Sequence, residues 1–349
     1  MSPLKRRLPA LLFLAALILA VLWRGWERQE VPPDLLTLDG FVWTTTWSVR
    51  VSHPPADPEL RALLRASVEE ELRAIDTLMS RFNENSVLSR FNRHRSLEPF
   101  PVPEELLATV ALALEVGRRT DGAYDITVPP LMRLWGFGDV RGRASAPDEQ
   151  EIAAALAKVG YEHLTVSFDP PSLRKAVPEL ELDLSSIAKG TGVDRVSALL
   201  EGLGVENYLV DVGGDLRVRG VRPDGNPWRI GIERPLLDRR EVHRVLELTS
   251  HGVASSGEYR NYVVIDGQRV SHTMDPRVGR PVAHPPSTVT VLAETAEEAD
   301  AWATAMNVMG VQEGLRLADE LGISVHFLTL LEEGLVERES EAFRRLLGP

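Results

Sequence analysis

A bend rich in small residues around one lysine is the first place in this sequence where chemistry could occur. Ser185, Ser186, Lys189 and Gly190 lie in the segment SSIAKGTG, between an alternating apolar run and a run with helical spacing. Where a strand leads into a helix, backbone N–H groups and the positive helix end point at one place, and Lys189 adds charge. The segment predicts a site for a phosphate-bearing ligand. It matches neither GxxxxGK[ST] nor GxGxxG, and a tight connection without a ligand explains it equally well.

A second candidate site lies near the C-terminal end. Thr295 and Glu298 have the spacing of a capping box, which predicts that a helix begins there. Asp300 and Thr304 are four residues apart, so a carboxylate and a hydroxyl share one helical face and suit a hard cation such as Mg²⁺. An aspartate early in a helix is also common without a metal, because it complements the helix dipole. Both interpretations stay open on these residues alone.

Three further stretches combine glycine, aromatic and polar residues more densely than a connection requires. They are Asp121 to Gly138, Asp211 to Leu216 and Ser255 to Val282. In the first, the aromatic side chains either line a pocket for a flat ring or belong to the core. In the last, His272 either acts as a general base toward a hydroxyl or caps a turn.

The elements that must position these residues are helices and strands in alternation. Apolar spacing predicts helices from Pro58 to Met79 and from Pro103 to Arg118. Alternation predicts strands from Phe41 to Val51 and from Glu179 to Leu184. The C-terminal third repeats the mixture, with strands around WRIGIE, RNYVVIDGQRV and STVTVLA and helices from about Thr295 and Val311. This interleaving predicts a mixed α/β (α+β) body.

Length, charge and cysteine content exclude several classes of protein. A chain of 349 residues is long enough for a sizeable core in one large or two ordinary domains. The net charge of −12 argues against a general nucleic-acid binder. The absence of cysteine excludes disulfides, thiol catalysis and zinc–thiolate or iron–sulfur sites. Any metal must therefore bind oxygen or imidazole.

The N-terminal segment is of a different kind. Three basic residues precede an uninterrupted apolar run of 16 residues, Leu8 to Trp23. Such a run fits a secretory signal or a short membrane span, and basic residues ahead of it keep that end in the cytoplasm. We expect residues 1–26 to anchor the chain uncleaved in the inner (cytoplasmic) membrane, 27–34 to form a tether, and 35–349 to form one domain on the periplasmic side. A cleaved signal and a buried helix are the alternatives.

Taken together, these stretches resemble the ApbE family, the FAD:protein FMN transferases of bacterial envelopes. The resemblance covers roughly residues 40–310, and its motifs occur in the family's order. The matching segments are Trp43 to Trp47, Ser80-Arg81-Phe82, Gly122 to Phe137, Asp183 to Asp194, Gly213-Gly214-Asp215, Ser256 to Tyr259, His272 to Pro281 and Glu298 to Ala305. It is the combination of these motifs, more than any one of them, that is specific.

The resemblance implies that the protein binds FAD with Mg²⁺, cleaves its pyrophosphate and transfers FMN to a threonine hydroxyl of a partner protein, releasing AMP. It implies catalytic roles for His272, as the base, and Asp300, with Mg²⁺ bound by Asp300, Thr304 and the backbone carbonyl of Ala188. The family's FAD contacts fall at Trp43, Phe82, Ala123, Tyr124, Asp125, Ser185, Thr191 and Met274, beside Lys189 of the bend. The implied acceptor is a short threonine-containing motif on an electron-transport subunit or a reductase.

Two alternatives to transfer remain. One is a Mg²⁺-dependent FAD pyrophosphatase that releases FMN and AMP, and the other is a non-catalytic protein that carries FAD. The sequence also departs from the family pattern at Trp43-Thr44-Thr45, Pro129, Thr191-Gly192 and Val278. Val278 and Met274 change the contacts and polarity around the flavin. The balance between transfer and hydrolysis is therefore open at this point.

Overall fold

The computed structural model describes residues 34–55, 57–138, 142–143, 145–236, 239–257, 262–285 and 287–347. The expected anchor, residues 1–26, lies outside the described residues, as does the expected tether except for Asp34. Among the helices of the described ranges, none combines the length and the apolar character that crossing a membrane requires.

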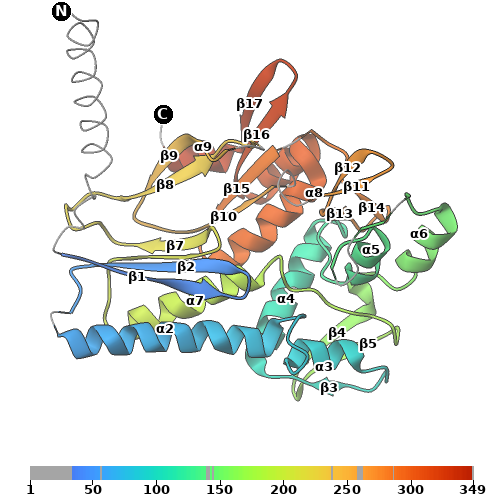
Figure 1. The fold of residues 1–349 in the computed structure, drawn as a ribbon, viewed down its shortest axis with the longest axis horizontal. Coiled ribbons are helices and arrows are strands. Elements are labelled where there is room, and N and C mark those ends of the chain that lie inside the picture. The colour runs from blue at the N-terminus through green and yellow to red at the C-terminus, as the bar shows by residue number, and fades with distance from the viewer. Residues whose placement is uncertain are drawn as a thin grey trace, which may run out of the picture.

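An eight-stranded sheet forms the centre of the described part of the chain (Figure 1). Neighbouring strands in it run antiparallel throughout. In spatial order they are β1 (Leu35–Val42), β2 (Thr45–Ser52), β6 (Tyr208–Val212), β7 (Asp215–Arg219), β10 (Ser250–Ser256), β15 (Ser287–Ala293), β16 (Ser324–Leu331) and β17 (Gly334–Glu339). The mixed α/β class is confirmed, in the form of helices packed on an antiparallel sheet.

Helices α2 (Pro58–Met79) and α7 (Ala188–Gly202) cover one face of the sheet on the side of β1, β2 and β6 (Figure 1). Leu72 of α2 and Val193 of α7 pack against Val210 of β6 in one buried cluster. Asp57 caps α2, because its carboxylate accepts a hydrogen bond of 2.9 Å from a backbone N–H in the first turn. The helix predicted from Pro58 to Met79 is therefore confirmed.

Helix α8 (Ala296–Leu321) packs on the same sheet against β10 and β15. Its N-cap is Thr295, whose hydroxyl accepts a hydrogen bond of 3.2 Å from the backbone of Glu298, as the capping pattern predicted. Gly310, with φ of 70°, interrupts the helix. The two helices predicted from about Thr295 and Val311 thus form one element with a break.

The opposite face of the sheet carries a two-stranded ribbon and the last helix. The ribbon consists of β8 (Trp228–Glu233) and β9 (Val242–Leu248), and the helix is α9 (Glu341–Leu347). Leu209 of β6 turns to this face, where it meets Ile230 and Phe343, whereas its neighbours in β6 face α2 and α7. Both faces of the sheet are therefore covered at β6.

The remaining elements lie to the right of β1 and β2 in Figure 1. They are α3 (Val87–Arg93), β3 (Phe100–Pro101), α4 (Glu104–Arg119), α5 (Pro129–Leu134), α6 (Glu149–Leu156), η1 (Tyr161–His163), β4 (Leu164–Phe168), β5 (Pro171–Lys175), β11 (Tyr262–Ile265), β12 (Gln268–Ser271), β13 (Met274–Asp275) and β14 (Arg280–Pro281). Leu107 of α4, Ala303 of α8 and Phe327 of β16 belong to one core cluster, which ties these elements to the sheet.

Three strand predictions were wrong. The stretch RNYVVIDGQRV, predicted as a strand, forms the antiparallel hairpin of β11 and β12 over its described residues. The strand predicted from Phe41 to Val51 is a hairpin, because Trp43, with φ of 54°, turns the chain between β1 and β2. The strand predicted from Glu179 to Leu184 forms no ladder; its alternate leucines are fully buried, and the Asn92 side chain bonds both backbone groups of Leu182 at 2.8 Å. The amide side chain thus satisfies a backbone N–H and a backbone C=O that a neighbouring strand would otherwise have to pair.

Candidate functional site

A cleft of about 280 Å³ opens where the segment before α5, the start of α7, the end of β10 and α8 meet. Nine of the thirteen residues that the sequence singled out line it: Ala123, Tyr124, Asp125, Ser185, Lys189, His272, Met274, Asp300 and Thr304. The structure therefore brings together residues that are up to about 180 positions apart in the chain.

A lysine and two carboxylates form the most strongly charged part of the cleft. Lys189 Nζ contacts the Asp215 carboxylate and lies 3.1 Å from each oxygen of Asp300. Burial raises the pKa of Asp215, and the Asp300 carboxylate beside it raises that pKa further. Burial disfavours the charged form of Lys189, but the two carboxylates outweigh it and raise the pKa of the ammonium group. With both carboxylates ionised, the cluster carries one surplus negative charge, and a bound cation would favour that form.

Helices α7 and α8 hold this cluster together because they approach closely. A Cβ on Gly190 would lie 2.4 Å from the carbonyl oxygen of Ala296, so only glycine fits there. The Asp194 carboxylate of α7 accepts hydrogen bonds from the first two N–H groups of α8, at 3.1 and 2.8 Å. The N–H of Gly190 in turn donates to Asp300 at 3.2 Å. These contacts fix Asp300 opposite Lys189.

The oxygen donors in the cleft suit a hard divalent cation. Asp300 and Thr304 lie one helical turn apart on α8, and both line the cleft. Carboxylate, hydroxyl and carbonyl oxygens are the ligands that Mg²⁺ prefers. Ala188, whose carbonyl the sequence suggested as a third ligand, is the first residue of α7 and directly precedes Lys189, although it does not itself line the cleft.

Tyr124 and Asp125 line another part of the cleft. The Tyr124 hydroxyl lies 3.0 Å from the hydroxyl of Ser186, and burial raises the pKa of the phenol. Asp125 accepts three hydrogen bonds, two of 2.7 Å from Thr127 and one of 2.8 Å from the backbone of Tyr161. Burial nevertheless raises the pKa of Asp125 to about 6. These contacts fix both side chains before any ligand binds.

His272 lies half-buried between β12 and β13 and lines the cleft. Its ring is edge-on to Phe137, with 6.5 Å between the ring centroids. Met274 follows in β13 and pairs with Pro281 of β14. The imidazole is therefore in the same cleft as Lys189 and Asp300, as a base for a bound hydroxyl group must be.

Two further predicted contacts lie behind the cleft. Trp43 packs against α7, where a Cβ on Gly192 would lie 3.2 Å from its ring. Thr191 is buried, and its hydroxyl lies 3.0 Å from the carbonyl oxygen of Ile187 and 2.9 Å from the carboxylate of Glu297, either of which can accept its one proton. Neither side chain lines the cleft, so both support its walls.

Phe82 lies outside the cleft, with 70% of its surface exposed. The guanidinium of Arg81 stacks 4.9 Å from its ring centroid and also donates a hydrogen bond of 2.7 Å to Asp183, which lines the cleft. Phe82 is thus connected to the cleft through Arg81. An exposed phenylalanine that is held in this way can cover a ligand that extends out of the cleft.

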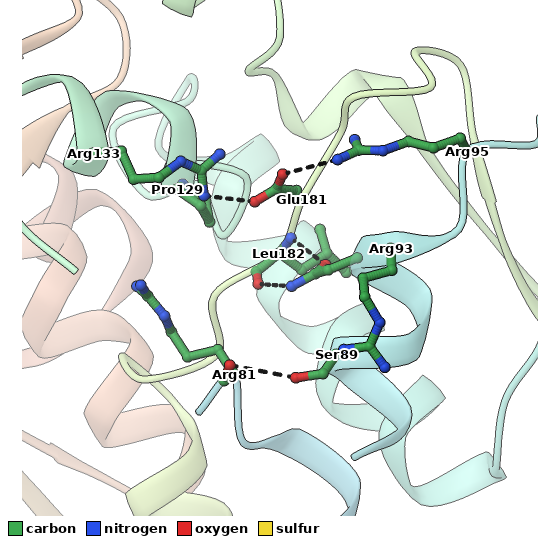
Figure 2. A pocket seen from close by; sticks show the side chains of 9 residues that line it. Arg81, Ser89, Arg93, Arg95, Pro129, Arg133, Glu181 and Leu182 are labelled. Carbon is green, nitrogen blue, oxygen red and sulfur yellow. Dashed lines mark hydrogen bonds and ion pairs between the residues drawn. The ribbon is translucent and has the colours of Figure 1, made fainter. Parts of the chain in front are cut away.

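Beside the cleft lies a smaller cavity of about 150 Å³, which is rich in arginine (Figure 2). Glu181 pairs with Arg133 at 2.7 Å and with Arg95 at 3.5 Å. Arg81 also lines this cavity, and its bond to Asp183 links the cavity to the cleft. The surplus of guanidinium groups makes this side positive in a chain that is negative overall.

Sequence reasoning gave no role to Asp215 or Asp183. Both stood in the quoted motifs, and Asp215 follows two glycines whose φ angles of 64° and 96° form the tight turn between β6 and β7. The available signal was the glycine pair itself, because such a turn fixes the direction of the next side chain. The contact between Asp215 and Lys189 depends on tertiary packing, which no local pattern shows.

The chain is similar to known proteins over nearly its whole length. A sequence model described as the ApbE family matches residues 43–327. The FAD:protein FMN transferase of Escherichia coli K12 is 37% identical over 96% of this chain and 95% of its own length, and that of Klebsiella pneumoniae is 39% identical over 96% and 97%.

Solved structures show the same fold. The flavin transferase ApbE from Vibrio cholerae matches with a TM-score of 0.80 and 38% identity, over 89% of this chain and 99% of that one. The apo form of the flavinyl transferase ApbE from Pseudomonas stutzeri matches with a TM-score of 0.82 and 37% identity, over 90% and 97%. On this similarity over nearly the whole length, the chain belongs to the ApbE family.

Proposed function

We propose that this protein transfers FMN from FAD to a threonine hydroxyl of a partner protein, with Mg²⁺ and with release of AMP. The observation that carries the proposal is the meeting of Asp300, Thr304, Lys189 and His272 in one cleft. Those residues come from three distant segments and provide oxygen donors, a cation for phosphates and a base. Relatives of nearly the same length are named FAD:protein FMN transferases.

Mg²⁺ would be held by Asp300, Thr304 and the carbonyl oxygen of Ala188. When bound, it neutralises the charge of the pyrophosphate and makes the AMP phosphate a better leaving group. Lys189 contributes a second positive charge on the same side. Since Lys189 already pairs with Asp215, the ammonium stays charged and in place when Asp300 turns to a metal.

The residues of the cleft account for the movement of each group in the reaction. The threonine oxygen forms a bond to the phosphorus of the FMN half, the bond from that phosphorus to the bridging oxygen breaks, and AMP leaves with the electron pair. His272 accepts the hydroxyl proton as the new bond forms. Lys189 stabilises the charge that develops on the phosphates.

The remaining predicted residues bind the flavin nucleotide. Ala123, Tyr124, Asp125, Ser185 and Met274 surround the ligand in the cleft. Phe82 covers the part that extends outward, and Trp43 and Thr191 hold the walls from behind.

We also propose where in the cell this protein works. Residues 1–26 anchor the chain in the inner membrane, and the catalytic domain faces the periplasm, where the acceptor is an electron-transport subunit or a reductase. The charge pattern of the sequence supports this orientation. Protease added to intact spheroplasts should digest the domain of the full chain, and membranes washed with carbonate should retain it. A domain protected inside spheroplasts contradicts this orientation.

The reaction is tested by incubating the protein with FAD, Mg²⁺ and a candidate acceptor, followed by mass spectrometry of acceptor peptides. We expect added FMN on threonine and an equal amount of AMP. Free FMN without modified acceptor would instead indicate a pyrophosphatase, and intact bound FAD would indicate a carrier.

A further inference from the structure

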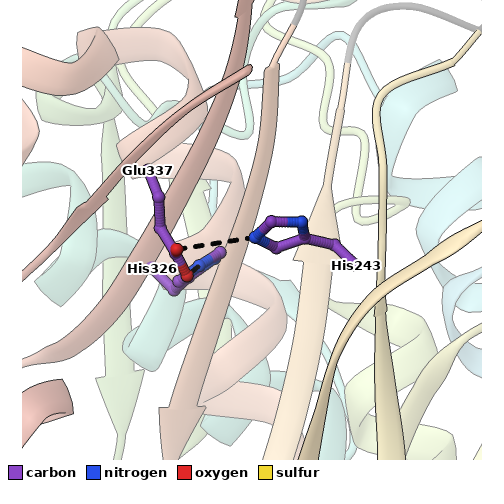
Figure 3. A group of neighbouring side chains, drawn as sticks. All are labelled: His243, His326 and Glu337. Carbon is purple, nitrogen blue, oxygen red and sulfur yellow. Dashed lines mark hydrogen bonds and ion pairs between the residues drawn. The ribbon is translucent and has the colours of Figure 1, made fainter.

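Two histidines and a glutamate form a cluster outside the flavin cleft. His243 of β9, His326 of β16 and Glu337 of β17 each offer one ligand atom, and these atoms lie within 4.8 Å of one another (Figure 3). Glu337 lies between the imidazoles, 2.6 Å from Nε2 of His326 and 3.5 Å from Nε2 of His243. None of the three lines the cleft.

The strand geometry aims these side chains at one point. His326 and Glu337 come from neighbouring strands, where Glu337 is diagonal to His326 because His326 pairs with Glu339. His243 reaches them from the ribbon through a β-bulge, since Arg244 pairs with Ile232 and Val242 with Glu233, which leaves His243 as the extra residue. A bulge redirects a side chain that regular alternation would point elsewhere.

The charges around the cluster favour a cation. Glu337 and Glu339 carry two negative charges, and Arg244 contacts both and supplies one positive charge. With both imidazoles neutral, as metal ligands must be, the cluster has a net charge of −1.

From this geometry we propose that His243, His326 and Glu337 bind one borderline transition-metal ion, with Zn²⁺ as the natural occupant, that clips the β8–β9 ribbon to β16 and β17. Imidazole nitrogens with a carboxylate form a typical zinc donor set, and water completes the four ligands. Mg²⁺ prefers oxygen donors and does not compete at this site.

Small movements are enough to form the site. Zinc bonds of about 2.0 to 2.1 Å place tetrahedral ligands about 3.3 Å apart. The carboxylate of Glu337 must therefore withdraw slightly from His326, and the ring of His243 must approach. Both can move, since the side chains of Glu337 and His243 are 37% and 20% exposed. His326 is fully buried and stays fixed.

The affinity should be moderate. Among the described residues, neither Nδ1 atom has a hydrogen-bond partner, although both atoms are buried. Metal-binding histidines usually donate that second N–H to a carboxylate or carbonyl, and losing such a partner costs about 10- to 100-fold in affinity. A site of moderate affinity is occupied only when enough zinc is present. The link between the ribbon and the sheet would therefore respond to the zinc supply.

The test is calorimetric titration of the chelator-stripped full chain with Zn²⁺ in the presence of saturating Mg²⁺, which occupies oxygen sites. We expect one saturable zinc equivalent per chain and a higher melting temperature with zinc. Glu337→Gln and His243→Ala should each weaken binding by at least about 100-fold and abolish the shift in melting temperature. Glu337→Gln retains the side-chain shape but loses the ion pair with Arg244, so each variant is compared through its own shift in melting temperature between the metal-free and the zinc-loaded protein.

Two controls locate the ion. Asp300→Asn, in the flavin cleft, should leave the zinc isotherm unchanged, and so should His163→Ala, which removes a histidine in η1. Co²⁺ in place of Zn²⁺ should give the visible absorption of a four-coordinate site in the wild type and the two controls only. Equal binding in Glu337→Gln and the wild type, or no saturable binding in the wild type, overturns the proposal.

Discussion

The contacts of Asp300 determine what the loss of its charge should do to activity. It accepts hydrogen bonds from Lys189 and from the N–H of Gly190, and it lies where a cation would bind. Asp300→Asn retains the shape and an oxygen acceptor but loses the charge. We expect the protein to fold and Mg²⁺-dependent FMN transfer to fall by at least about 100-fold, measured as FMN on acceptor threonine across a Mg²⁺ titration.

Asp319→Asn is the matched control for that change. Asp319 lies near the other end of α8, is exposed, and accepts a hydrogen bond of 2.7 Å from the backbone of Glu341. The same chemical change on the same helix should leave transfer unchanged. Full activity in Asp300→Asn would remove Asp300 from the metal site.

His272→Ala separates binding from chemistry. If His272 accepts the threonine proton, its loss should reduce the rate of transfer by about 10²- to 10⁴-fold. The dissociation constant for FAD, measured by quenching of flavin fluorescence, should change by only a few-fold, since other side chains line most of the cleft. His163→Ala serves as the control. An unchanged transfer rate in His272→Ala would exclude it as the base.

Asp125 gives a pH dependence with a definite sign. Its pKa is raised from the ordinary value of 3.8 to about 6, mainly by burial, so the folded state binds the proton more tightly than the unfolded state does. The contribution of this group to stability is fully present below the unfolded pKa and is lost as pH rises through about 6. Between about pH 4.5 and 7.5, the free energy of unfolding should lose about 2 kcal/mol through Asp125.

Urea denaturation at both ends of this pH range, for wild type and for the non-titrating Asp125→Asn, measures that loss. The wild type should lose more stability than the variant as pH rises, by about that amount. Equal losses in the two proteins would mean that Asp125 titrates near its ordinary pKa.

How well single residues could be predicted depended on how local their contacts are. Asp300 and Thr304 were found because both lie on one helical face, four residues apart, which the sequence shows directly. Asp215 was missed because its contact with Lys189 joins positions 26 residues apart in the chain. Phe82 was predicted as a contact by resemblance, and its exposure shows that such a position can lie outside the cleft of the unliganded protein.

Among the elements, the crossing of α7 and α8 matters most for the site. Gly190→Ala would place a methyl group 2.4 Å from the Ala296 carbonyl oxygen, so the helices must separate. We expect a loss of about 1 to 3 kcal/mol in the free energy of unfolding. Because the N–H of Gly190 also holds Asp300, Mg²⁺-dependent transfer should fall as well. Urea denaturation and the transfer assay measure the two effects.

Gly202→Ala tests the same substitution at the other end of α7. A Cβ there meets nothing within 4 Å, so the variant should be as stable as the wild type or slightly more stable, with normal activity. If Gly190→Ala behaved like Gly202→Ala, the close approach of α7 and α8 would not be what positions the cluster.

The elements that sequence patterns predicted well are those whose pattern has a single structural explanation. A run of 22 residues with helical spacing, such as α2, has no other explanation, and its bounds agree with the prediction. The alternation from Glu179 to Leu184 had two structural explanations: a strand, or an extended segment that buries every second side chain without pairing. The side chain of Asn92 decides between them, and it lies 90 residues away.

At the scale of the whole molecule, the cleft exists only in the folded chain. Its lining comes from the segment around Tyr124, the start of α7, β10, β13 and α8. These segments are separated in the sequence and meet beside the first half of α8. The class of fold was predictable from the alternation of elements. The sheet order was not, because β10 lies between β7 and β15 through pairings that are distant in the sequence.

Because several elements share the cleft, a ligand that fills it should stabilise the whole molecule. A ligand that binds only the folded state adds about 2.7 kcal/mol at a concentration of about 100 times its dissociation constant. We expect FAD with Mg²⁺ to raise the melting temperature of His272→Ala, a background in which FAD is not consumed. FAD alone should raise it less, since the charge of its pyrophosphate then faces the carboxylates of Asp215 and Asp300 without a metal. Scanning calorimetry across a range of FAD concentrations measures both shifts.

The double variant His272→Ala/Asp300→Asn separates the metal from the nucleotide in this experiment. It lacks one of the carboxylates, so FAD should stabilise it to the same extent with and without Mg²⁺. If Mg²⁺ increased the stabilisation of the double variant as much as that of the single one, the ion would bind FAD elsewhere than at Asp300. If FAD stabilised neither protein, the cleft would not be the nucleotide site, whatever the activity of the relatives.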